Sequence, residues 1–334
     1  MYEKRTYKYA CQACQTKLQK WGKTAAGAQR YRCPQCSGTQ VKKRPDLSRQ
    51  LVLEHFVAWL LGKQSQDELP TGTTARTWRN QTAWCWDIAP KPEPTGEVHH
   101  AVILDGIHVG SLVCLIARTT EYVIAWHWAG YESSNTWSEL LAAIPAPTFV
   151  VCDGQKGILL AIVRCWPEAG IQRCLFHVWL NVRSKLTLSP KTEAGQDFLL
   201  LTRALWQVHT EADVAAWQQQ FRAWEKRYGD FVRQRTYVRD PRPNQRRWWY
   251  THGRLRSAYR QLQKLQEQQR LFTYVYNADP RLPRTTNHME GGINSQLRTK
   301  LKLHRGLSDE HQRRLVEWYL YSRTEGQKPT RNFL

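Results

Sequence analysis

Three acidic residues stand where a folded chain could bring carboxylates together. Asp105 in VILDGIH and Asp153 in FVVCDGQKG each end an apolar, strand-like run, and Glu290 begins a predicted helix in TTNHMEGGIN. A carboxylate at a strand end projects from the carboxyl edge of a sheet into a crevice. Its hard oxygens suit Mg²⁺, with Mn²⁺ as a substitute, and two such ions promote in-line phosphoryl transfer. The three acids are therefore candidate ligands of a two-metal site.

Each acid also has a purely structural interpretation. Asp-Gly is a strong turn signal, so Asp105-Gly106 could turn a hairpin, and Asp153-Gly154 could end a strand and begin a helix. Asn287 and Glu290 have the spacing of a capping box. The two glycines after Glu290 argue against a simple cap, because glycine costs about 1 kcal/mol inside a helix. Both interpretations stay open at this point.

Four cysteines have the spacing of a separate metal site. Cys11-x2-Cys14 and Cys33-x2-Cys36 are two CxxC pairs, and four thiolates can close a tetrahedral shell around one Zn²⁺. The total of nine cysteines is odd and the others are scattered, which argues against a disulfide framework. We expect residues 1–42 to form a zinc ribbon, which either only stabilises its own fold or also contacts DNA.

Composition limits the class of protein and its partners. The 334 residues predict two or three domains, and 49 Lys+Arg against 28 Asp+Glu give a net charge of +21. Such an excess favours a polyanionic partner, and nucleic acid is the leading candidate. The N-terminus lacks the apolar core of a signal peptide, and no apolar run approaches the roughly 18 residues of a membrane span. A cytoplasmic protein without a membrane partner is expected.

The positions after the cysteines predict a helical DNA-binding segment at residues 45–88. An apolar helix is followed by a Pro-Thr-Gly turn, and Thr73 or Thr74 could cap the helix ARTWRNQTAWCW. This order resembles a helix-turn-helix, whose second helix enters the major groove. An ordinary helical pair is the alternative. The candidate DNA contacts on the second helix are Arg76, Arg79, Asn80 and Gln81.

Beyond a proline-rich linker at 89–97, the residue pattern predicts strands. The runs at 99–109, 111–117 and 121–129 predict three antiparallel strands, a helix capped by Ser134 follows, and the run at 147–153 predicts a buried parallel strand before another helix. This is the element order of a ribonuclease-H-like α/β domain. In such a sheet the first and fourth strands are neighbours, so Asp105 and Asp153 could share one metal pair.

The segment at 179–281 is predicted to be all-helical and basic. Fourteen Arg and Lys against four acids lie between Arg222 and Arg270, with tryptophans interleaved. Cations and aromatic rings together suit a nucleic-acid groove, whereas a helical bundle would keep its tryptophans inside. We expect both, a basic face and a tryptophan-rich core. Arg246 and Arg247 are the candidate DNA contacts here.

A Cys-x-x-His pair completes the pattern of motifs. Cys174 and His177 in IQRCLFHVWLN would share a helix face, and alone they could be half a zinc site or core packing. The order DGQKG, QRCLFH, a helical stretch of about a hundred residues and then TTNHMEGGIN resembles bacterial insertion-sequence transposases of the Mutator superfamily. The resemblance covers residues 98–325, and the ribbon with the helix-turn-helix fits one subgroup.

The resemblance implies a fold and a site. It implies a ribonuclease-H-like catalytic domain at 98–178 and 282–325, interrupted by an α-helical insertion domain at 179–281. Asp105, Asp153 and Glu290 become the catalytic triad and Mg²⁺ ligands, with Cys174 and His177 as the accessory catalytic pair. The sequence departs from relatives at Leu180, where Arg is frequent.

The sequence thus predicts a DNA transposase. Asn287, Glu290, Asn294 and Arg298 share a predicted helix face, so phosphate-binding groups flank an acid, although a solvent-facing polar stripe is the alternative. The protein would bind terminal inverted repeats of double-stranded DNA as a homodimer, cut strands and join them, in association with the nucleoid. A nuclease or resolvase on the same fold, and a domesticated regulator without catalysis, are the rival hypotheses.

Overall fold

The chain forms two compact units in a computed structural model. The structure describes residues 9–11, 15–25, 27, 29–41, 45–64, 74–239, 242, 244, 247–277, 279, 281–286 and 292–334. One unit comprises residues 1–92 and 296–334, and the other comprises residues 93–295. This division is coarser than the domain boundaries expected from the sequence, which stay predictions.

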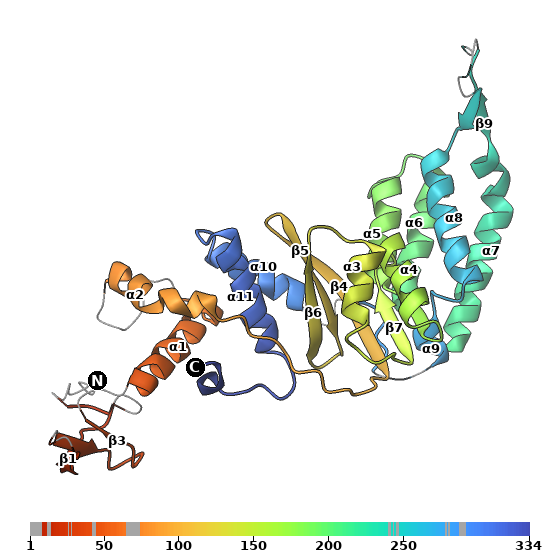
Figure 1. The fold of residues 1–334 in the computed structure, drawn as a ribbon. Coiled ribbons are helices and arrows are strands. Elements are labelled where there is room, and N and C mark those ends of the chain that lie inside the picture. Colours follow the sequence, from red (N-terminus) through yellow and green to blue (C-terminus); the bar gives the residue numbers. More distant parts are fainter. Residues whose placement is uncertain are drawn as a thin grey trace, which may run out of the picture. The chain divides into compact units, whose positions relative to one another are not determined.

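A mixed five-stranded sheet is the centre of the unit formed by residues 93–295 (Figure 1). Strands β4 (Ala101–Val109), β5 (Leu112–Arg118) and β6 (Val123–Ala129) pair antiparallel. Strands β7 (Phe149–Cys152) and β8 (Gly170–Arg173) run parallel to β4, and the order is β6-β5-β4-β7-β8. The α/β class and the neighbouring first and fourth strands are confirmed.

Helices α3 (Ser134–Leu141) and α4 (Lys156–Cys165) cover one face of this sheet. Alternate β4 residues Val102 and Leu104 point into that core, whereas Ala101 and Ile103 belong to a second core on the other face. The period-2 alternation of a strand therefore places Asp105 on the face away from α3 and α4. The residue that caps α3 is Ser133 rather than the expected Ser134, because Ser133 Oγ accepts from Thr136 N at 3.1 Å.

The two Asp-Gly pairs differ in structure. Strand β4 continues through Asp105-Gly106, and its hairpin turn comes at Gly110, whose φ is +57°, so a turn at Asp105 is wrong. At the other site, Asp153 follows β7 directly and Gly154 has a φ of +72°, which favours glycine. The Asp153-Gly154 pair therefore ends a strand and leads into α4, as its structural interpretation proposed.

A helical bundle follows the sheet and shares one continuous core. Its four long helices stand side by side in Figure 1: α5 (Leu175–Leu186), α6 (Glu193–Ala204), α7 (Glu211–Arg233) and α8 (Gly253–Glu267). The 3₁₀ turn η3 (Leu205–Gln207) follows α6, and the short helix α9 (Thr273–Tyr276) follows α8. Trp217 and Trp224 of α7 are buried here and donate to backbone carbonyls of α6 at 2.9 and 3.0 Å. The expected tryptophan-rich core is confirmed.

The bundle is not all-helical, contrary to the sequence prediction. Strands β9 (Arg235–Tyr237) and β10 (Trp248–Tyr250) form an antiparallel hairpin between α7 and α8. Each strand is only three residues long, and that length is too short to produce a recognisable alternation of apolar and polar positions.

The chain returns from the bundle along the outer side of β8. Arg173 N donates to Arg270 O at 2.8 Å, and Leu175 N donates to Arg284 O at 2.9 Å. The Thr273 hydroxyl donates to Ile171 O at 2.9 Å. The entry and the exit of the bundle are therefore joined by backbone hydrogen bonds at the sheet.

The other unit contains a small sheet and several helices. Strands β1 (Gln19–Lys23), β2 (Gln29–Arg32) and β3 (Thr39–Gln40) pair antiparallel. The helices are α1 (Pro45–Leu61), α2 (Ala75–Thr82), α11 (Asp309–Tyr321) and most of α10 (Ile293–Leu303), with 3₁₀ turns η2 (Ala83–Asp87) and η4 (Thr330–Phe333). Residues 65–73, which include the predicted turn between α1 and α2, lie outside the described residues.

Aromatic contacts join α1 to α2 and to the residue that follows α10. Trp59 of α1 packs edge-on to Trp78 of α2, with ring centroids 6.2 Å apart, and to His304, at 4.9 Å. Thr74 caps α2 by accepting from Thr77 N at 3.2 Å. Among the residues that the structure describes, no helix has the length and apolarity to cross a bilayer.

Replacing Trp217 with alanine should destabilise the bundle strongly. The side chain is 2% exposed, and its loss leaves a cavity and the Leu201 carbonyl without its donor. We expect the free energy of unfolding to fall by about 3–5 kcal/mol, measured by urea denaturation with circular dichroism. Trp249→Ala, at a site that is 48% exposed, is the control and should change it by less than about 0.5 kcal/mol. Equal effects would contradict the assignment of the core.

Candidate active site and metal centre

Asp105 and Asp153 occupy equivalent positions on neighbouring parallel strands. The register pairs Ile103 of β4 with Val151 of β7, so each acid stands two residues beyond a paired position. The two carboxylates interact, because the negative charge of Asp153 contributes to raising the pKa of Asp105. The structure thus brings together the two acids that the sequence placed at strand ends.

Both oxygens of the Asp105 carboxylate accept hydrogen bonds. Oδ1 accepts from Gly106 N at 3.0 Å, and Oδ2 accepts from the Asn294 side chain at 2.9 Å. Burial is the main cause that raises the pKa of Asp105, while the nearby His177 and Arg118 lower it. Arg118 also donates to Thr286 O. The two hydrogen bonds orient the Asp105 carboxylate, and the neighbouring positive groups stabilise its charged form.

The position of Asp153 is fixed by the turn that follows β7. Its Oδ1 accepts from Gln155 N at 2.9 Å, and its carbonyl oxygen accepts from the Arg173 guanidinium. The same guanidinium packs over Gly154, where a Cβ would overlap it. Glycine is required at this position both by the positive φ and by the close approach of Arg173.

Cys174 and His177 lie beside the two acids at the start of α5. Cys174 is the N-cap residue, and its thiol accepts from Thr286 N at 3.2 Å. Burial alone would raise the pKa of Cys174, but hydrogen bonds with His177 and Thr286 lower it. The Cys174 thiol in turn raises the pKa of His177, and the charges of Asp105 and Asp153 add to this shift. The pair therefore places the His177 imidazole near both carboxylates, whose charges favour its protonated form.

A carboxylate near this site, on the other face of β4, was not found from the sequence. Glu132 lies between β6 and α3, and a Cβ on Gly106 would be 2.8 Å from its Oε1. Burial raises the pKa of Glu132, and the charges of Asp153 and Asp105 raise it further. Glycine at 106 leaves room for this carboxylate, and a glycine inside a strand run was the only sequence signal that pointed to a close approach.

The donor set fits a hard divalent cation. Asp105 and Asp153 offer carboxylate oxygens, and burial together with the negative charge of Asp153 raises the pKa of Asp105. A divalent ion would offset this repulsion, and oxygen ligands are those that Mg²⁺ prefers. Glu290 and Asn287 lie outside the described residues, as does Arg246.

The other predicted DNA contacts are on the surface. Arg76, Arg79, Asn80 and Gln81 are exposed on α2, whereas Trp78 and Thr82 of the same helix are buried. Arg247 precedes β10 and Arg298 lies on α10, and both are exposed. Exposure is what phosphate or base contacts require, although it does not identify the ligand.

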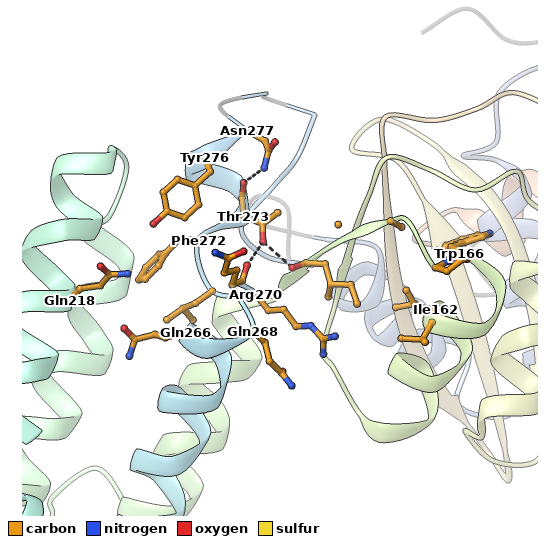
Figure 2. A pocket seen from close by; sticks show the side chains of 17 residues that line it. Ile162, Trp166, Gln218, Gln266, Gln268, Arg270, Phe272, Thr273, Tyr276 and Asn277 are labelled. Atoms are coloured by element: carbon orange, nitrogen blue, oxygen red, sulfur yellow. Dashed lines mark hydrogen bonds between the residues drawn. The ribbon is translucent and has the colours of Figure 1, made fainter.

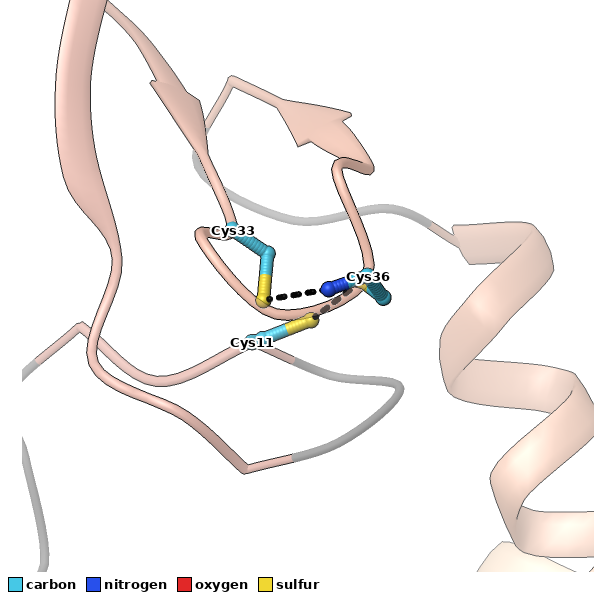
Figure 3. A group of neighbouring side chains, drawn as sticks. All are labelled: Cys11, Cys33 and Cys36. Carbon is cyan, nitrogen blue, oxygen red and sulfur yellow. Dashed lines mark hydrogen bonds between the residues drawn. The ribbon is translucent and has the colours of Figure 1, made fainter.

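Three cysteines at the N-terminus form a second candidate metal site. The sulfur atoms of Cys11, Cys33 and Cys36 lie within 4.8 Å of one another, and the Sγ atoms of Cys11 and Cys36 are 3.6 Å apart (Figure 3). Cys14 is outside the described residues. Soft sulfur ligands in a compact group suit Zn²⁺, so this cluster could bind zinc.

A larger cavity lies away from these groups. It measures about 670 Å³ and is lined by Ile162 of α4, by Trp166 directly after that helix, and by the returning segment from Arg270 to Asn277 (Figure 2). The described lining contains none of the predicted site residues. The cavity therefore gives no support to an alternative location for the chemistry.

Comparison with known proteins agrees with the sequence resemblance. Residues 117–242 match the sequence model described as Transposase, Mutator family. That match includes Glu132, Asp153, Cys174 and His177 but not Asp105. The chain is similar to three insertion-sequence transposases. The transposase for IS1201 of Lactobacillus helveticus is 28% identical over 120 residues, 33% of this chain and 31% of that protein.

Two further relatives give the same result. The transposase for IS905 of Lactococcus lactis subsp. lactis (strain IL1403) is 30% identical over 111 residues, 32% of this chain and 28% of that protein. The transposase for ISRM5 of Rhizobium meliloti (strain 1021) is 28% identical over 168 residues, 47% of this chain and 40% of that protein. The chain thus matches less than half the length of each relative. The matched part of the chain is thus similar to the Mutator family of transposases and to transposases of insertion sequences.

Replacing Cys174 with alanine should lower the pKa of His177. The thiol is the largest cause that raises this pKa, so without it the imidazolium should lose its proton at a lower pH than in the unaltered protein. An NMR pH titration of the imidazole C–H resonances measures the change. Cys165→Ala, at the end of α4, is the control and should leave the curve in place. An unchanged pKa in Cys174→Ala would show that the pair does not interact.

Replacing Cys33 with serine should remove the metal from the N-terminal cluster. Cys33 is fully buried within it, and serine offers a poor ligand for Zn²⁺. We expect the unaltered protein to carry about one zinc per chain, and the variant to carry almost none, by elemental analysis after gel filtration. Cys165→Ser should keep its zinc. A full zinc content in Cys33→Ser would exclude the four-cysteine assignment.

Proposed function

We propose that this protein is a DNA transposase that binds the terminal inverted repeats of an insertion sequence, cleaves strands and joins them to target DNA. The observation that carries the proposal is the register of β4 and β7, which gives Asp105 and Asp153 equivalent positions on adjacent strands. The sheet order, with three antiparallel strands and two parallel strands beside the first, supports a ribonuclease-H-like catalytic domain. The match of residues 117–242 to the Mutator-family transposase model supports DNA as the substrate.

Glu290 is proposed as the third acid of the triad. The described residues on either side of it contact the site, because Thr286 donates to the Cys174 thiol and Asn294 donates to Asp105. Glu290 lies four residues from each of these two residues in the sequence. The proposal therefore uses contacts of the neighbouring residues and the family resemblance together.

The chain's own groups have distinct tasks in the proposed reaction. Two Mg²⁺ ions, held by Asp105, Asp153 and Glu290, would supply nucleophile activation and charge stabilisation for in-line phosphoryl transfer. Asn294 and Gln155 orient the two aspartates through hydrogen bonds. Water first attacks a phosphodiester and frees a 3′ hydroxyl, which then attacks the target strand. The His177 imidazolium offers positive charge where the phosphate approaches.

The remaining parts of the chain are proposed to hold DNA. A zinc ribbon and a helix-turn-helix would bind the element ends, with Arg76, Arg79, Asn80 and Gln81 toward the duplex. Asn287, Arg298 and the basic insertion, including Arg246 and Arg247, would hold phosphates. Because two ends must be brought together, we propose that the protein acts as a homodimer on DNA, in the cytoplasm at the nucleoid.

Asp153→Asn should bind element ends and fail to cleave them. The amide keeps the side-chain shape but removes a charged metal ligand. Even groups that only orient metal ligands cost about 10–100-fold when replaced, so cleavage should fall by at least about a hundredfold. The assay uses a labelled element end with Mg²⁺, maps the cut strand, and measures end binding separately.

Glu168→Gln is the matched control, because Glu168 is an exposed acid of the same unit. It should cleave as the unaltered protein does. Strand cutting by Asp153→Asn would overturn the triad assignment. Cutting without joining by the unaltered protein would favour a nuclease or resolvase, and binding without metal-dependent nicking would favour a regulator.

A further inference from the structure

The β9–β10 hairpin exposes large aromatic rings at the end of the helical bundle. Figure 1 shows it projecting beyond α7 and α8. Tyr237 is 65% exposed and Trp249 is 48% exposed, whereas Trp217 and Trp224 of the same unit are almost fully buried. Apolar rings in open solvent cost solvation free energy that a partner could recover. The structure thus separates the tryptophans of this segment into core residues and surface residues.

The register assigns the hairpin residues to two faces. Arg235, Tyr237, Trp248 and Tyr250 share one face, because Tyr237 pairs with Trp248 and Arg235 pairs with Tyr250. The other face carries Trp249, which pairs with Thr236. Exposed rings are therefore available on both sides of the two-stranded ribbon.

Guanidinium groups order the rings on the first face. Arg235 stacks on Trp248 with its Cζ atom 4.0 Å from the ring centroid, and Arg256 of α8 stacks on Tyr250 at 3.9 Å. These stacks fix the ribbon against α8 and keep positive charge beside the aromatic rings. The exposed ring of Tyr237 extends this face outward, and the exposed ring of Trp249 projects from the opposite face.

The charge of the hairpin is strongly positive. The sequence from 235 to 250 contains five arginines and one acid. Arg235, Arg239, Arg242 and Arg247 are exposed. Clustered arginines match the closely spaced phosphates of a DNA strand. Charge complementarity therefore selects nucleic acid as the partner of this surface.

We propose that the β9–β10 hairpin is a DNA-contacting element whose arginines bind the phosphate backbone and whose Trp249 and Tyr237 rings stack on unpaired bases. Stacking on an exposed ring requires a base that has left its own stack, and a transposase creates such bases where it opens and cuts DNA. The inference rests on the proposed function for the origin of the unpaired bases. It rests on the exposure, the register and the charge of the hairpin for the binding itself.

The test compares two DNA probes of equal length and arbitrary sequence. One is fully paired, and the other contains unpaired 2-aminopurines, whose fluorescence is quenched when an aromatic ring stacks on them. Binding is measured by anisotropy with the full-length protein and no added Mg²⁺. Trp249→Ala should weaken binding to the unpaired probe by about fivefold or more and abolish the quenching, with little effect on the paired probe. Trp249→Tyr should restore both.

Further variants separate stacking from charge and from folding. Tyr237→Ala should reproduce the selective loss, whereas Tyr276→Ala, at a half-exposed tyrosine of α9, should bind both probes normally. Replacing Arg239 and Arg247 with glutamine should weaken both probes and lower the salt slope by about one for each arginine. Circular dichroism checks that each variant keeps its helix content.

Two results would overturn the inference. The first is unchanged affinity and quenching in both Trp249→Ala and Tyr237→Ala. The second is an equal loss on both probes, which would assign the rings to duplex contacts. Cleavage assays keep the proposed function separate, because a protein that stacks on the unpaired probe through Trp249 yet never cuts DNA would refute the transposase proposal alone.

Discussion

The parallel pairing of β4 with β7 is the constraint on which the rest of the site depends. It gives Asp105 and Asp153 equivalent positions on adjacent strands, so two negative charges share one desolvated place. Such an arrangement costs free energy unless cations or hydrogen bonds compensate it. Arg118, Arg173 and the imidazole of His177 surround the acids for this reason. A divalent cation bound between the two aspartates would further reduce their repulsion.

Segments that are far apart in the sequence are joined by hydrogen bonds around the two aspartates. Thr286 links the returning chain to Arg118 on β5 and to Cys174 at the start of α5. The N-cap position of Cys174 matters because it sets His177 in the first turn of a helix that begins at the sheet. A helix start placed one turn later would carry the imidazole away from both carboxylates. The accessory pair thus depends on the β8 to α5 junction.

Most of the five-stranded sheet could be predicted from sequence patterns, but less of the candidate site could. The strands at Asp105 and Asp153 could be predicted because long apolar runs with alternation identify strands, and two such strands fix the acids. The position of Glu132 near the site could not be predicted, because Glu132 belongs to no motif and lies in the loop between β6 and α3. The β9–β10 hairpin was missed because each of its strands is only three residues long, which is too short to show an alternation of apolar and polar positions. The third acid, Glu290, stays a prediction.

The chain that returns along β8 has a consequence for the aggregation of the protein. An open edge strand offers unpaired backbone groups to any other strand, including one from a second copy of the chain. At β8 the segment from Arg270 to Arg284 already contacts the backbone of Arg173, Ile171 and Leu175. The helical insertion therefore also shields a sheet edge. This cover protects the β8 edge from strand-to-strand aggregation.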